Sequence, residues 1–172
     1  TLCNASAPWE ETFEAANSNI ECWQIMKNTA EDGGLNGNSL LPAETGSWFA
    51  CTPESFEGLG NQYIYEGTRS AAIGADATDF NWLITAELQM PESGKTDLSF
   101  RVYYTSEEAA ITKFYVNLYN SGTWQTLLSY NDMSAGINHF AEPVMVNLDA
   151  FQGQTIRLAF VYEQNNGNIL SV

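Results

Sequence analysis

The chain has 172 residues, of which 44% are hydrophobic and 13% aromatic. This length suits one domain with a substantial core, and this composition excludes a disordered chain. The 6 Lys and Arg stand against 21 Asp and Glu, and the formal net charge of -15 argues against nucleic acid as a partner, because its phosphates would be repelled. No apolar run approaches the roughly 20 residues that span a bilayer. We therefore expect a single globular domain over residues 1–172 that does not span a membrane.

In chain order, the first half of the sequence is irregular. Its short candidate strands are separated by loops 29–46 and 52–60, which are rich in Gly, Asn and acidic residues. Loops of this kind are where proteins accommodate ions or ligands. The candidate strands of this half are residues 9–14, 22–27, 47–51, 61–66 and 70–74.

From about residue 80 onward, apolar and polar residues alternate with period two, the pattern of a half-buried strand. The alternation is clearest over residues 97–104, and it recurs over 113–119 and 156–162. Turns rich in Gly, Asn, Ser and Pro separate these runs, and short polar turns join antiparallel strands. Because no long apolar stripe at helical spacing competes with this pattern, we predict an all-β fold, an antiparallel jelly-roll-like β-sandwich.

The outward phase of these later strands carries Tyr103, Tyr115 and Tyr119. Tyr115 and Tyr119 fall on one face of one strand, so a flat aromatic strip could form there. Sugar rings stack on such strips, and Lys113 and Asn117 lie close enough to hydrogen-bond sugar hydroxyl groups. The three tyrosines are therefore candidate ligand-binding residues of a carbohydrate-binding face. The alternative is that their rings pack beneath loops or against the other sheet.

The remaining chemistry in the sequence is sparse. Cys3, Cys22 and Cys51 allow one disulfide with one thiol left over, and the sequence leaves their pairing open. Catalysis by a triad would need a histidine, and the single histidine, His139, fits a structural or surface role better. A glycosidase or other hydrolase is a third hypothesis, which requires two carboxylates at a catalytic separation in a cleft.

Five motifs occur in a fixed order along nearly the whole chain. They are Glu11-Thr12-Phe13-Glu14, Cys22-Trp23, Glu66-Gly67-Thr68-Arg69-Ser70-Ala71, Asn81-Trp82-Leu83-Ile84-Thr85 and Gly153-Gln154-Thr155-Ile156-Arg157-Leu158-Ala159-Phe160. In this order they resemble the cleaved-adhesin, or choice-of-anchor J, family of bacterial surface modules, whose fold is related to MAM domains and jelly-roll carbohydrate-binding modules. Two departures from the family pattern are Ala86, where a proline is usual, and the end at Val172, before a usual acidic pair.

The resemblance implies a non-catalytic adhesion or binding module that is secreted or lies on the outer cell surface of a bacterium, beside other domains of a longer chain. Its partner would be a protein or a glycan that the sequence does not identify. The resemblance also implies a structural calcium ion, for which Glu14 is the first candidate ligand and Asp79 the second. Calcium takes six to eight oxygen ligands, so the acidic pair missing after Val172 puts one ligand in doubt. Carbohydrate binding through the tyrosine face is the alternative function.

Overall fold

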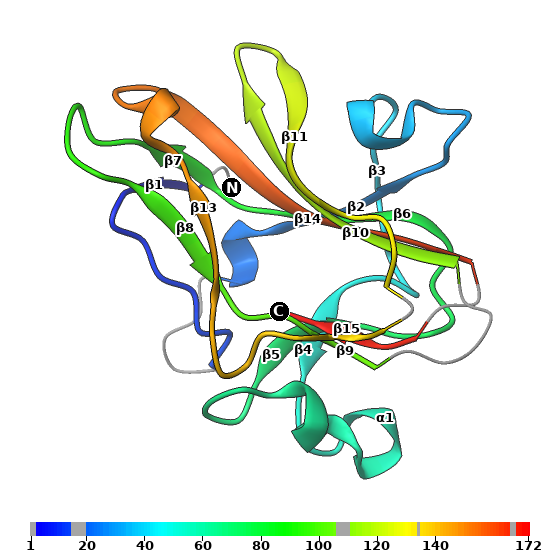
Figure 1. The fold of residues 1–172 in the computed structure, drawn as a ribbon. Coiled ribbons are helices and arrows are strands. Elements are labelled where there is room, and N and C mark those ends of the chain that lie inside the picture. The colour runs from blue at the N-terminus through cyan, green and yellow to red at the C-terminus, as the bar shows by residue number, and fades with distance from the viewer. Residues whose placement is uncertain (1–2, 15–19, 106–110, 134, 166–167) are drawn as a thin grey trace.

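Two layers of β-strands enclose the interior of the molecule (Figure 1). The computed structural model describes residues 3–14, 20–105, 111–133, 135–165 and 168–172. The described helices are single turns, and none of them is long and apolar enough to cross a membrane. The predicted all-β sandwich is therefore confirmed.

The larger layer is an eight-stranded sheet built around the long strand β14. This strand pairs with β10, β6 and β7, all antiparallel, whereas the short β1 joins the edge of the sheet by parallel pairing with β7. The strands of this layer are β1 (Asn4–Ser6), β2 (Gln24–Asn28), β3 (Leu41–Pro42), β6 (Asp79–Ile84), β7 (Glu87–Gln89), β10 (Ile111–Asn120), β11 (Thr123–Tyr130) and β14 (Thr155–Asn165).

The second layer is a five-stranded sheet, and a separate two-stranded ribbon lies at one side of the sandwich (Figure 1). The sheet contains β4 (Phe49–Cys51), β5 (Ser70–Ile73), β9 (Tyr103–Tyr104), β12 (Ile137–Asn138) and β15 (Leu170–Ser171), and the ribbon contains β8 (Asp97–Phe100) and β13 (Val144–Asn147). The helical turns are α1 (Ser55–Gly58) and four 3-10 turns at Ile20–Cys22, Gly34–Asn36, Gly60–Tyr63 and Asp149–Phe151.

The central strands of the larger sheet are covered on both faces. Leu83 and Phe160 point into the main core between the layers, whereas Trp82 and Val161 point outward and are also buried. Leu35, Leu40 and Trp124 pack over this outer cluster, and the Trp82 indole donates a hydrogen bond to Asn28 Oδ1 at 3.0 Å. The half-buried pattern expected for β10 and β14 is therefore wrong, because a loop and β11 cover the face that the alternation assigned to solvent.

Two strands expected in the first half are not formed. Residues 9–14 belong to no strand, because Phe13 has a φ of 57° and its N–H bonds the Glu11 carboxylate at 2.6 Å, while the N–H of Glu14 bonds Thr12 Oγ1. A strand residue would instead donate to a neighbouring strand. Residues 61–66 contain the end of a 3-10 turn and a bend.

The strand expected over residues 97–104 is divided between the ribbon and the second sheet. β8 ends at Phe100 and β9 begins at Tyr103, since the chain crosses from one to the other at Arg101 and Val102. The Val102 carbonyl accepts a hydrogen bond from His139 N–H at 2.9 Å, which anchors the crossing.

Candidate functional site

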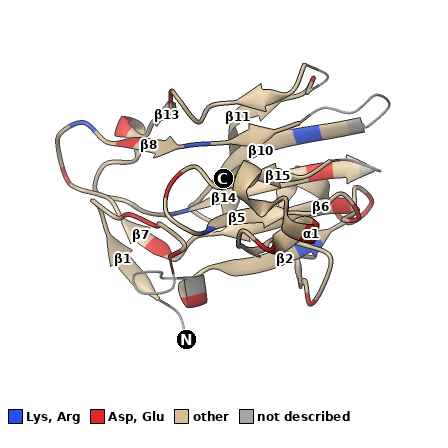
Figure 2. Cartoon of the chain, turned by 90° about the horizontal axis from the view of Figure 1, so that it is seen from below, with Lys and Arg blue, Asp and Glu red and all other residues tan. Residues whose placement is uncertain are grey.

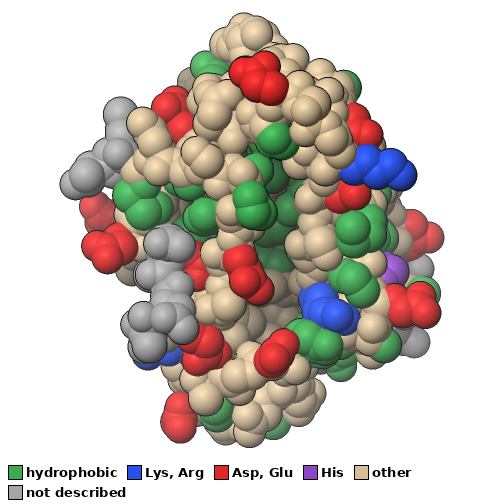
Figure 3. Space-filling view, turned by 90° about the vertical axis from the view of Figure 1, so that its left-hand side faces the viewer, with side chains coloured by type: hydrophobic (Ala, Val, Ile, Leu, Met, Phe, Trp, Pro, Cys, Tyr) green, Lys and Arg blue, Asp and Glu red, His purple; other side chains and the backbone are tan. Residues whose placement is uncertain are grey.

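A groove of about 920 Å³ opens between the ribbon strand β8 and the N-terminal segment. One wall is the continuous run of residues 95–101, which contains β8, and the opposite wall is the continuous run 7–14. Figure 3 shows a hollow lined with hydrophobic side chains on this side of the molecule. We call this feature the groove.

The floor of the groove is part of the main hydrophobic core. Phe160 of β14 lies between Phe100 and Trp23, with ring centroids 4.9 Å and 6.3 Å away. Leu158 and Leu88 extend the apolar floor toward the edge of the larger sheet. Because these side chains are held by packing on several sides, the floor is a fixed surface.

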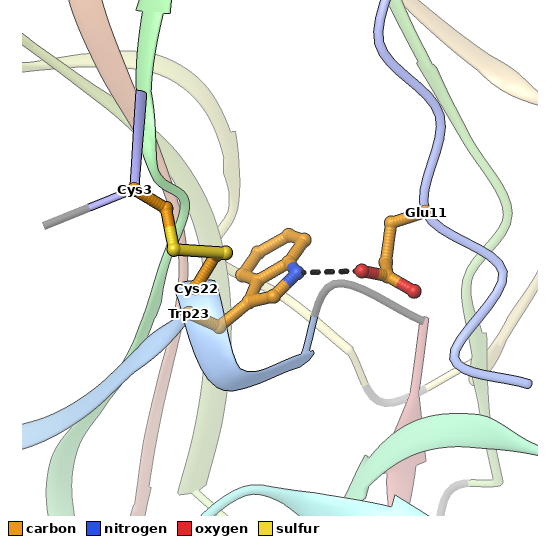
Figure 4. The surroundings of a disulfide bond; sticks show 4 residues. All are labelled: Cys3, Glu11, Cys22 and Trp23. Atoms are coloured by element: carbon orange, nitrogen blue, oxygen red, sulfur yellow. Dashed lines mark hydrogen bonds between the residues drawn. A yellow bond between two sulfur atoms is a disulfide. The ribbon is translucent and has the colours of Figure 1, made fainter. Parts of the chain in front are cut away.

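The wall formed by residues 7–14 is tied to the core by side-chain bonds. The Glu11 carboxylate accepts a hydrogen bond from the Trp23 indole N–H at 3.1 Å, and the adjacent Cys22 forms a disulfide with Cys3 (Figure 4). The third cysteine, Cys51, is a buried free thiol. The sequence allows one disulfide with one thiol left over without fixing the pairing, and the structure pairs Cys3 with Cys22.

The charged lining of the groove is mixed: three cations line it together with five carboxylates, those of Glu10, Glu11, Glu14, Glu66 and Asp97. Acidic side chains are spread over loops and strand ends of the chain (Figure 2), yet Arg69, Lys95 and Arg101, half of the 6 cationic residues, line the groove. The two ion pairs found in the described part of the chain, Lys113–Glu163 and Arg157–Glu87, involve none of these three. The groove is therefore less acidic than the remaining surface.

Aromatic rings meet a guanidinium group at one end of the groove. The Arg101 guanidinium lies 3.8 Å above the Tyr65 ring and donates a hydrogen bond to the Phe140 carbonyl. Tyr65 is 47% exposed, and its ring centroid is 5.6 Å from that of Phe140. Neither aromatic was singled out from the sequence, since Tyr65 was assigned to a candidate strand that does not form and Phe140 lies in a loop.

The three tyrosines predicted to form a sugar-binding strip do not form one. Tyr115 is only 5% exposed and lies in the outer cluster with Leu35 and Leu40, where burial and the Glu163 carboxylate, which accepts a hydrogen bond from its hydroxyl group, raise its pKa. Tyr119 is half-buried against Trp124. Tyr103 belongs to the second layer. The expected tyrosine strip is therefore not formed. The alternation placed Tyr115 and Tyr119 correctly on one face of β10, but other side chains cover that face.

The structure does not bring the two predicted calcium ligands together. Glu14 holds the turn before β5: its Oε1 accepts hydrogen bonds from the N–H groups of Thr68 and Arg69 at 2.6 and 2.9 Å. Asp79 begins β6 opposite Gln164, whose side chain bonds the Gly74 carbonyl at the other end of β5. No group of three or more His, Cys, Asp or Glu residues suited to a metal is found among the described residues. A calcium site shared by Glu14 and Asp79 is thus not formed, and a calcium ion elsewhere stays a prediction.

The hydrogen bonds that the Glu14 carboxylate accepts affect its pKa. The Thr68 hydroxyl and N–H, followed by the Arg69 N–H, hold the pKa of the Glu14 carboxyl below its ordinary value. A carboxyl group whose pKa is lower in the folded state than in the unfolded state stabilises the fold at pH values above its unfolded-state pKa. This contribution is lost as the pH falls through the folded-state pKa. We expect Thr68→Ala to raise the Glu14 pKa in an NMR titration of the side-chain carboxyl carbons. Thr126→Ala, on the exposed side of β11, is the control, and an unchanged Glu14 pKa in Thr68→Ala would contradict the assignment.

Comparison with known proteins adds little beyond the architecture. No family model matches the sequence, and no curated protein sequence matches it. A search of solved structures finds a carbohydrate-binding module, TmCBM61, solved in complex with β-1,4-galactotriose, with a TM-score of 0.48 and 12% sequence identity over 74% of this chain and 87% of that chain. Similarity at this level gives no information about the ligand. The resemblance to the choice-of-anchor J family stays a prediction.

Proposed function

We propose that this chain is a non-catalytic binding module whose ligand occupies the groove. The observation that carries the proposal is the groove itself, an apolar hollow between two walls on whose floor Phe160, Phe100 and Leu158 retain 7%, 9% and 5% of their exposure. Large concave apolar surfaces on soluble proteins are typically ligand sites, because covering them releases water. The polar and charged groups at the rim would orient that ligand.

The proposal includes action outside the cell, either secreted or on a bacterial surface. The Cys3–Cys22 disulfide supports this location, since disulfides persist in oxidising compartments and are rare in the cytosol. The free thiol of Cys51 is compatible with it because the side chain is fully buried, and burial raises its pKa, which keeps the less reactive thiol form.

A glycan is a second candidate ligand, favoured by the aromatic rim of the groove. Tyr65 is 47% exposed beside Phe140, with the Arg101 guanidinium over its ring, and Arg69 also lines the groove. Sugar rings stack on aromatic faces, and guanidinium groups hydrogen-bond their hydroxyls. This candidate replaces the tyrosine strip predicted from the sequence and predicts that Tyr65→Ala weakens sugar binding.

The proposed function predicts that filling the groove abolishes binding. Glu10 is exposed on the groove wall, whereas Glu31 is exposed in the loop that follows β2. We expect Glu10→Trp to weaken ligand binding at least about ten-fold, because the indole occupies space that the ligand needs, and Glu31→Trp to leave it unchanged. The measurement is NMR titration with two probe sets: neutral oligosaccharides, and peptides selected from a phage-displayed library of random dodecapeptides.

Both variants replace a glutamate with a tryptophan, so a difference in ligand binding between them reflects where the substitution lies. Amide signals of residues 7–14 and 95–101 should move with at least one probe set in the wild-type chain. If neither set moves them, or if binding is equally strong in Glu10→Trp, the groove is not the binding site.

A further inference from the structure

We propose that the ligand of the groove is an extended polypeptide segment that pairs through its backbone with the open edge of β8. This inference rests on the proposed function and specifies its ligand. Three observations support it: the backbone groups of β8 that point toward the groove, the apolar side chains of the floor, and the charges at the two ends of the β8 wall.

The hydrogen-bond phase of the ribbon determines which groups are available. Phe100 pairs with Val144 and Asp97 with Asn147, and the bond from Leu148 N–H to the Thr96 carbonyl at 2.8 Å continues this register. In an antiparallel pair, residues that bond across the ladder alternate with residues whose N–H and C=O point away. Leu98 and Phe100 therefore bond β13, and the Thr96 carbonyl bonds Leu148, the residue after β13.

The backbone groups of Asp97 and Ser99 consequently point away from β13. The ribbon has two strands, so this edge of β8 has no strand partner, and it is the edge that lines the groove, whereas β13 does not line it. Unpaired strand edges are templates for the addition of another strand. A polypeptide provides N–H and C=O groups at the matching spacing, which a glycan does not.

The floor beside this edge suits alternating side chains. Leu98 and Phe100, the residues that bond β13, point their side chains into the main core, and Asp97 and Ser99 point theirs to solvent. A strand added beside β8 continues this alternation. Its inward side chains would cover Phe160 and Leu158, so apolar residues are expected at every second position of the ligand.

The opposite wall leaves space for such a strand without competing for it. Residues 9–14 form no strand, and the N–H groups of Phe13 and Glu14 are bound by the side chains of Glu11 and Thr12. The added segment therefore forms its ladder with β8 alone. A segment matching residues 95–101 would be about 23 Å long at the usual rise of a strand.

Charge complementarity favours acidic residues at the ends of the segment. Lys95 and Arg101 stand at the two ends of the β8 wall, and Arg69 also lines the groove. None of the three takes part in the ion pairs of the described residues. An Asp or Glu flanking the apolar positions would meet these cations. The ligand we infer is thus a strand of alternating apolar residues with an acidic flank.

The first test selects peptides from the phage-displayed dodecapeptide library on the wild-type chain, with counter-selection on Glu10→Trp. We expect enriched sequences with apolar residues at alternate positions. In a synthetic peptide of the enriched sequence, N-methylation of one alternate series of amides should weaken binding at least about ten-fold, because those N–H groups bond β8, while methylation of the other series should change it little.

The second test uses two residues that face each other across the ribbon. Ser99 and Met145 form a pair whose N–H groups both point away from the ladder, Ser99 toward the groove and Met145 to the far edge. Proline removes an N–H, and at such positions it leaves the ladder bonds intact. Ser99→Pro should therefore lose peptide binding at least about ten-fold, and Met145→Pro, at a 57% exposed residue, should retain it.

The outcomes separate this inference from the proposed function. Equal effects of both methylated series, equal binding by Ser99→Pro and wild type, or enriched peptides without alternation would each overturn strand pairing. If the groove signals move with oligosaccharides and not with peptides, the module binds glycans and the strand inference is wrong while the proposed function stands. If they move with neither, both are wrong.

Discussion

Replacing Trp82 with alanine should lower the free energy of unfolding by about 4 kcal/mol, within the range measured for buried Trp and Phe truncations. The Trp82 side chain is fully buried in the outer cluster, its ring packs edge-on against Trp124 at 5.0 Å, and its N–H is the donor to Asn28 Oδ1. Truncation leaves a cavity under the loop of residues 35–40 and an unpaired acceptor on a buried asparagine. Urea unfolding followed by circular dichroism measures the change.

Two further variants separate the contributions at this position. Trp82→Phe keeps most of the apolar area and removes the hydrogen bond to Asn28, so its effect should be smaller than that of alanine. Trp124→Ala removes a half-buried ring from the same contact and should also have a smaller effect. A loss below about 1.5 kcal/mol in Trp82→Ala would mean that the loop does not hold the cluster closed.

Val161, in the same outer cluster as Trp82, shows where sequence periodicity stops being informative. Alternation identified β10 and β14 correctly, because period two is a local property of each strand. Whether the second face of a strand is covered depends on a distant segment, here residues 35–40 and β11. The same limit applies to Tyr115, whose side of β10 was identified and whose burial was not.

The candidate site was less accessible to sequence analysis than the fold. Its apolar floor comes from residues that any core would contain, and its walls are an irregular segment and one edge of a two-stranded ribbon. A free edge is defined by the absence of a partner strand, which no local pattern records. Glu11 and Glu14 carry little signal beyond their charge, yet one fixes Trp23 and the other fixes the turn of Thr68.

Removing the Cys3–Cys22 disulfide should lower the free energy of unfolding by about 3 kcal/mol in the chain-entropy description, because it closes a loop with a sequence separation of 19 residues. The double variant Cys3→Ser, Cys22→Ser tests this by thermal unfolding. A thiol reductant should lower the Tm of the wild-type chain toward that of the double variant and leave the double variant unchanged, so the comparison excludes a general effect of the reductant.

The same variant tests how the groove wall is held. The disulfide joins Cys3, the residue before β1, to Cys22, next to the Trp23 that bonds Glu11. Without it, the wall is held at this end by the pairing of β1 with β7, the Ala7–Gln89 backbone bond and the contacts of Trp9 and Glu11 with Trp23, so backbone amides of residues 9–12 should exchange faster with deuterium while those of β14 change little. Unchanged exchange at residues 9–12 would show that these remaining contacts are enough to fix the wall. Faster exchange together with weaker peptide binding would show that the disulfide keeps the groove in its binding shape.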